Sequence, residues 1–243
     1  MNSRIQRQKA FTLVELLVVV AIIGIIGSFA IPAAQTMLKS SSLVQASNLL
    51  VDQMSLARQH ALSKNRIVEV RFYKYADLEA PGESATNQAT WAFRGFQFFE
   101  IGEHGVIMPV SKFTSIPSSI VMSDKEKLSP LLIEPTAAGK SRIVVHATAA
   151  FNVKTATSLP QGIGHNYDYV PFHFLPDGTT SLSPAGVKGK ASEGGRWFIT
   201  LYSVSDAAKA TADVPPPNFF TWMVDPTSGT SKTFRPEVGK VKK

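Results

Sequence analysis

Residues 11–31 read FTLVELLVVVAIIGIIGSFAI, an apolar run whose one charged side chain is that of Glu15. Wound as an α-helix with a rise of about 1.5 Å per residue, this run is about 31 Å long, which matches the hydrocarbon core of a bilayer. The leader before it, residues 1–10, carries basic side chains and no acid. Basic flanks stay in the cytoplasm. The sequence therefore predicts a membrane-spanning helix over residues 11–31, with its N-terminus in the cytoplasm and the rest of the chain exported.

Glu15 is the unexpected residue in this run. A carboxylate near the centre of a bilayer costs about 2.5–3.5 kcal/mol, and less near an interface. A simple anchor gains nothing from such a charge, so the acid implies a cationic partner. The alternative is that Glu15, which lies only a few residues into the run, extends to the headgroups.

The neighbours of Glu15 favour the first interpretation. A basic leader, the small residue Ala10, the sequence FTLVELL and a long aliphatic run resemble the N-terminus of a type IV prepilin, continuously over residues 9–32. In that family a prepilin peptidase cuts before the Phe and methylates the new N-terminus, which implies processing at Ala10 and methylation of Phe11. The family's Glu pairs with the N-terminal ammonium of a neighbouring subunit, which implies an assembly role for Glu15. Pro32 lies where many pilins break the helix, and proline predicts a break on physical grounds too.

The family usually has Gly before the cleaved bond, and Ala10 departs from that pattern. An ordinary secretory leader is the alternative, because Ser28-Phe29-Ala30 fits a small-x-small cleavage site. The acid within the run argues against a secretory leader. So does the length of the run, since the apolar core of a signal peptide has roughly 7–15 residues.

Residues 32–64 continue the helix in amphipathic form. Apolar residues recur at helical spacing and form one stripe, made of Leu43, Leu50, Met54, Ala57 and Ala61. The opposite face is polar and carries Gln45, Asn48, Asp52, Arg58 and Gln59. Such a stripe predicts packing against a sheet.

Residues 65–243 change to the patterns of β-strands. Strands are predicted over 66–73, 89–101, 106–110, 119–122, 142–147, 167–175, 196–203, 219–224 and 231–234. Turn-rich segments separate them, and no internal repeat is evident. The predicted fold is α+β: a long N-terminal helix packed on a mainly antiparallel, β-rich globular head with a basic C-terminal tail.

Two tight turns add to the resemblance: residues 174–178 read FLPDG and residues 225–230 read DPTSGT. In this order after a prepilin leader, they resemble the H-type minor pseudopilin family, which includes minor pilins and has a β-sandwich-like head. The segments LVDQMSLARQHALSKNRIVEVRFYKYAD, NFFTWMVDP and SKTFRP resemble Verru_Chthon cassette protein D, a pilin-like set without an established activity. These likenesses imply a structural role for both turns.

Residues that could carry chemistry form no convincing set. The chain has no cysteine and five histidines. None of the histidines is spaced as a metal pair, although His165 and His173 flank a predicted strand. No nucleophile elbow or phosphate loop is present. Asp225 offers a single carboxylate to calcium, and the aromatic residues in 91–99 are predicted to be core. The sequence predicts no catalytic residue, metal or cofactor, with an anchored enzyme or solute-binding domain as the remaining alternative.

The net charge of +7 is concentrated at the two ends of the chain. The C-terminal cluster consists of Arg235, Lys240, Lys242 and Lys243, and it is the candidate polyanion-binding site. A minor pilin that binds DNA or another polyanion through this tail is the alternative function, with salt-sensitive affinity and no base specificity.

The main hypothesis is a structural subunit of a type IV pilus or a type II secretion-like filament. The resemblance implies a precursor inserted once in the bacterial inner membrane, with the head in the periplasm or outside the cell, and later incorporated into a filament. Its implied partners are other pilin subunits, prepilin peptidase, an inner-membrane assembly platform and, before assembly, membrane lipid. The absence of paired C-terminal cysteines favours a minor subunit.

Overall fold

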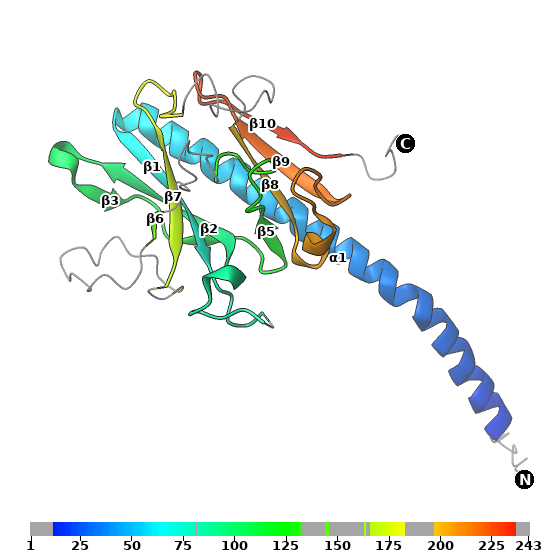
Figure 1. Ribbon diagram of the computed structural model, residues 1–243. Coiled ribbons are helices and arrows are strands. Elements are labelled where there is room, and N and C mark those ends of the chain that lie inside the picture. Colours follow the sequence, from blue (N-terminus) through cyan, green and yellow to red (C-terminus); the bar gives the residue numbers. More distant parts are fainter. Residues whose placement is uncertain are drawn as a thin grey trace, which may run out of the picture. The chain divides into compact units, whose positions relative to one another are not determined.

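The computed structural model describes residues 12–80, 82–132, 144–145, 163, 166–182 and 197–236, with the side chains of 29–36 and 144–145 excepted. Within these ranges the chain forms one long helix followed by a β-rich region (Figure 1). It divides into two compact units, residues 1–41 and residues 42–243.

Helix α1 (Leu13–Lys64) belongs to both units. It ends where Asn65 adopts a left-handed backbone conformation, with φ of 52°. Asn tolerates this conformation better than most residues, and it is a common way to terminate a helix. The backbone N–H of Arg66 then donates to the carbonyl of Ala61 at 3.3 Å, which satisfies one carbonyl of the last turn.

The expected helix break at Pro32 is not found, because α1 continues through this residue without interruption. A proline removes one N–H donor from a helix and crowds the preceding turn. The chain is helical on both sides of Pro32, so the loss of one hydrogen bond does not interrupt the helix.

In the first unit, the apolar side chains of α1 are exposed. Between Leu13 and Ile26 the large aliphatic side chains have exposed fractions of 46–79%. Among the residues that the structure describes, no helix is both long and apolar enough to cross a membrane.

In the second unit the strands form one antiparallel sheet. Their bounds are β1 (Ile67–Tyr75), β2 (Ala92–Ile101), β3 (Ile107–Pro109), β4 (Thr114–Ser115), β5 (Ile120–Met122), β6 (Val144–Val145), β7 (Asp168–Phe174), β8 (Trp197–Ser203), β9 (Phe219–Val224) and β10 (Ser231–Phe234). The strand order is β10-β9-β8-β5-β2-β1-β7-β6, and β3 and β4 also pair with β2. Short 3-10 helices lie at η1 (Gln88–Thr90), η2 (Glu103–Gly105) and η4 (Val204–Lys209). Figure 1 shows the strands lying alongside the C-terminal part of α1.

The main core lies between α1 and the sheet. All five residues of the predicted apolar stripe are buried, with exposed fractions of 0–2%. They pack with the alternate residues Val68, Val70 and Phe72 of β1 and with aromatic residues of β2, β7 and β9. Burying a side chain of Leu or Met size contributes about 1.5–3 kcal/mol, so this stripe holds the helix on the sheet.

Strand β1 is buried on both faces. The alternate residues of β1, which point to the opposite face of the sheet, are also buried. Glu69, Arg71 and Tyr73 are at most 8% exposed. The guanidinium of Arg71 lies 4.1 Å from the ring centre of Phe99 and 4.7 Å from that of Tyr169. On this second face, aromatic side chains of β2 and β7 therefore pack over the guanidinium of Arg71.

The strand predictions agree with the structure at most positions, and those for β9 and β10 match at both ends. The aromatic residues predicted to be core are buried: Trp91, Phe93, Phe96, Phe98 and Phe99. Strand β4 and the 3-10 helices were not predicted. Of the strand predicted over 142–147, only residues 144–145 are among the described residues, and they are paired with β7.

Candidate functional site

The start of α1 is built around Thr12 and Glu15. The backbone N–H and hydroxyl of Thr12 donate to Oε2 of Glu15 at 2.9 and 2.8 Å. The N–H of Glu15 donates back to the hydroxyl of Thr12 at 3.2 Å. This reciprocal arrangement is a capping box, which satisfies two of the free N–H groups of a helix start. Glu15 therefore orders its own helix terminus.

No described residue donates to the second carboxylate oxygen of Glu15, Oε1. This oxygen lies at the beginning of a helix whose apolar side chains are exposed, from Leu13 to Ile26. The arrangement offers one negative charge at the edge of an apolar surface. Such a surface fits helix packing against other helices, with the charge selecting a cationic partner. The predicted processing residues, Ala10 and Phe11, lie outside the described residues.

A second notable site is the junction of the two predicted turns. Arg58, on α1, donates from Nε to the carbonyl of Gly178 at 3.1 Å and from Nη2 to the carbonyl of Ser228 at 2.9 Å. The N–H and hydroxyl of Thr180 both donate to the carbonyl of Pro226, at 3.0 and 3.1 Å. The structure thus joins the helix and both turns directly, and we call this the turn junction.

The two turns have the same internal design. In the first, the hydroxyl and N–H of Thr179 hydrogen-bond to Asp177 and hold the pKa of its carboxyl below the usual range. In the second, the hydroxyl of Thr227, with the backbone N–H groups of Ser228 and Thr227, has the same effect on the pKa of Asp225. Each Asp shapes its own turn, in line with the structural role implied by the sequence.

A charged cluster on the other face of the sheet was not predicted. Glu69 is paired with Arg71, and its Oε2 lies 3.0 Å from Nε2 of His173 on β7. Burial alone would raise the pKa of Glu69, but the hydrogen bond to His173 and the charge of Arg71 outweigh it, and the pKa is lowered. The cluster therefore keeps a buried carboxylate ionised and links β1 to β7.

His173 also lies next to a hydroxyl. Its Nδ1 is 3.3 Å from Oγ of Ser181, so Ser181, His173 and Glu69 form a hydrogen-bonded row. The hydroxyl of Ser181 accepts from the backbone N–H of His173 at 3.0 Å, and Ser181 N–H donates to the His173 carbonyl at 3.0 Å. A hydrolase of the Ser-His-Asp type needs a nucleophilic hydroxyl that is free to react. It also needs a histidine base that is held in place by a carboxylate with no other ionic partner. Here the hydroxyl is part of a strand pairing and the acid is shared with Arg71, which fits a structural role.

The remaining described histidines are His60 and His104. Among the described residues, no group of three or more metal-binding side chains is found. His60 pairs with Glu100 at 2.9 Å and connects α1 to β2. His165, which was considered as a partner of His173, lies outside the described residues.

The basic C-terminal cluster lies mostly outside the described residues. Lys240, Lys242 and Lys243 lie outside the described residues, and Arg235 is exposed. Nothing in the structure or in the comparisons with known proteins supports binding of DNA by this cluster.

Comparison with known proteins decides the family. Residues 5–31 match the family model described as the prokaryotic N-terminal methylation motif. The fimbrial protein EcpC of Eikenella corrodens is 31% identical to the chain over 115 residues, which are 47% of this chain and 70% of EcpC. The chain belongs to the type IV pilin family. This pilin is therefore a structural subunit, and its family implies other pilus subunits and a prepilin peptidase as partners.

Solved structures were also compared with this pilin. Two structures of the minor pseudopilin EpsH, from the type 2 secretion system of Vibrio cholerae, align with it. The first has a TM-score of 0.36 and 8% identity and covers 79% of this pilin and 95% of EpsH. The second has a TM-score of 0.35 and 11% identity and covers 82% and 97%. The likeness to Verru_Chthon cassette protein D stays a prediction.

Proposed function

We propose that the protein is a minor pilin or pseudopilin that is cut between Ala10 and Phe11, methylated on Phe11 and assembled through α1. In the assembled filament, Glu15 pairs with the N-terminal ammonium of a neighbouring subunit. Before assembly the protein is anchored in the inner membrane, with its head in the periplasm. The motor that extracts the subunit is external, because the sequence contains no nucleotide-binding motif.

The observation that carries this proposal is the environment of Glu15. Its Oε2 caps the helix through Thr12, and its Oε1 has no donor among the described residues. An ammonium beside Oε1 would make a charge-assisted hydrogen bond, which is about twice as strong as a neutral one. Pairing would also reduce the cost of placing the charge in an apolar environment, so a wrongly docked subunit would leave an uncompensated charge.

The first experiment is to determine the intact mass and N-terminal sequence of the protein from native membranes. We expect a chain that begins at methylated Phe11. A chain that begins at Met1 would contradict processing, with Ala10 as the residue to test next. A chain that begins at Ile31 would identify an ordinary secretory leader and would overturn the assembly role of Glu15.

A matched pair of variants tests the role of the charge. Glu15→Gln keeps an acceptor for Thr12 and removes the negative charge, so we expect normal processing with a large loss of incorporation into filaments. Asp52→Asn removes an exposed charge from the head part of α1 and serves as the control. Equal incorporation of the two variants would contradict the proposed pairing.

A further inference from the structure

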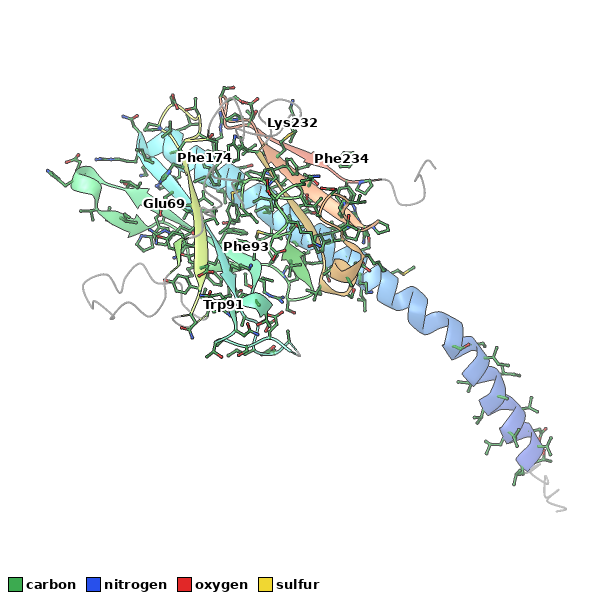
Figure 2. All side chains as sticks on the ribbon, viewed as in Figure 1. Glu69, Trp91, Phe93, Phe174, Lys232 and Phe234 are labelled. Carbon is green, nitrogen blue, oxygen red and sulfur yellow. The ribbon has the colours of Figure 1, made fainter. Side chains whose placement is uncertain are left out.

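A cavity lies directly beside the turn junction, within the second compact unit. It has a volume of about 170 Å³ and lies between α1, the end of β7 and the β9–β10 hairpin. Its lining residues are Met54, Ser55, Arg58, Phe174, Trp222, Gly229, Thr230 and Ser231. Figure 2 labels Phe174 on β7 and Lys232 on the neighbouring part of β10. None of the lining side chains is acidic.

Two donors of the lining have no acceptor in the part of the chain that the structure describes. Trp222 is fully buried, and no described residue accepts from its indole N–H. A buried N–H that stays unpaired destabilises the fold, so the unpaired indole of Trp222 needs a physical explanation. The guanidinium of Arg58 uses Nε and Nη2 for the two turn carbonyls, and no described residue accepts from Nη1.

The charge of Arg58 also has no counter-ion among the described residues. Its two hydrogen-bond acceptors there are neutral backbone carbonyls. The hydroxyl of Ser231 adds a group that can donate. The hydroxyl of Ser55 already donates to the carbonyl of Val51 at 2.8 Å, and that of Thr230 lies 2.7 Å from the hydroxyl of Ser228. A cation, an indole N–H and a hydroxyl around one small cavity are complementary to an anion with acceptor oxygens only.

We propose that this cavity is a binding site for a single carboxylate group. Arg58 supplies the charge through Nη1, and the Trp222 N–H donates to a carboxylate oxygen. The carboxylate comes either from an acidic side chain of a neighbouring filament subunit or from a small soluble acid. Only the first of these sources depends on the proposed function, because binding of a soluble acid requires no filament.

Acetate is the probe for the isolated full-length protein in detergent micelles. The reporter is the indole N–H signal of Trp222 in nitrogen-15 NMR spectra, assigned by its loss in Trp222→Phe. We expect a saturable downfield shift on addition of acetate at constant ionic strength, and no such shift with chloride. The indole N–H of Trp91 already donates to Ser84 at 2.9 Å and should not move. A Trp222 signal that does not move, or that moves equally with chloride, would overturn the proposal.

A variant that carries its own carboxylate tests the site without disturbing Arg58. Ser55 is exposed at the cavity, so Ser55→Glu places an acid next to it as an internal competitor. Since a tethered group acts at a millimolar effective concentration or higher, acetate affinity should fall about tenfold or more. Gln59→Glu adds the same charge at an exposed position outside the cavity and should leave acetate affinity unchanged. An equal loss in both variants would overturn the site, because it would reflect net charge alone.

Incorporation of Ser55→Glu into filaments identifies the source of the carboxylate. A loss of incorporation with normal processing and folding, absent in Gln59→Glu, supports a neighbouring subunit. Normal incorporation with lost acetate binding supports a soluble acid. The acetate measurement stands whether or not the protein assembles, so failure of the site and failure of the filament role are distinguished.

Discussion

Gly229 is the position at which the turn junction is most sensitive. It is buried, it has a positive φ of 63°, and a Cβ added there would overlap the carbonyl oxygen of Gly178. That oxygen is also the acceptor for Nε of Arg58. Gly229→Ala must therefore either separate the two turns or move the backbone that Arg58 holds.

The expected loss has two parts. A non-glycine residue in the left-handed conformation costs about 1–2 kcal/mol. Overpacking against a buried backbone group adds about 1–3 kcal/mol. The free energy of unfolding should fall by about 2–5 kcal/mol in total, a large part of the roughly 5–15 kcal/mol of a typical domain.

Gly105→Ala provides the control for the backbone part alone. Gly105 has a positive φ of 76°, and nothing lies within 4 Å of an added Cβ. Unfolding in urea, followed by tryptophan fluorescence of the full-length protein in detergent, gives the midpoint of each variant. We expect Gly229→Ala to lose about 1–3 kcal/mol more than Gly105→Ala. Equal midpoints would refute the close approach of the two turns.

Three further changes test the core and the buried charges. Leu50→Ala removes a fully buried side chain between α1 and the sheet and should cost about 2–5 kcal/mol in the same urea assay. The lowered pKa of Glu69 means that its ionised form stabilises the fold above about pH 4, and that this contribution is lost as the pH falls. Glu69→Gln should therefore make the free energy of unfolding depend less on pH at acidic pH. Burial raises the pKa of Asp168, although the charge of Lys74 opposes it, and no described residue donates to Asp168 Oδ1. Asp168→Asn should therefore raise the urea midpoint at pH 7, and this gain should disappear below about pH 4.

Periodicity and turn chemistry were sufficient to predict the helix stripe and most strands. The stripe from Leu43 to Ala61 is buried as expected because helical spacing alone places those residues on one face. The two turns were also predictable, since Asp and Gly determine their conformations locally. The start of α1 could be located from the prepilin resemblance, and the capping box at Thr12 follows the pattern of a hydroxyl residue and a Glu three positions later.

The turn junction could not be predicted, because it depends on partners far apart in the chain. Arg58 was assigned to the polar face of α1, opposite the apolar stripe, and the structure shows it half-buried against the carbonyls of Gly178 and Ser228. Every residue has a backbone carbonyl, so the sequence could not identify the two carbonyls that accept hydrogen bonds from Arg58. The alternation in β1 likewise gave no sign that Glu69 and Arg71 are buried, because their enclosure requires aromatic residues of β2 and β7.

The sequence separations at the turn junction bear on the order in which the head folds. The two hydrogen bonds of Arg58 close loops of 120 and 170 residues. Contacts between residues so far apart in the sequence form late in folding. Closing such a long loop costs conformational entropy before the contact stabilises the fold. A chain is synthesised from its N-terminus, so Arg58 is made long before its last acceptor, the carbonyl of Ser228. The complete junction therefore forms only after the chain has been made as far as Ser228. A chain that ends before Ser228 could form the hydrogen bond from Arg58 to Gly178 but not the second one.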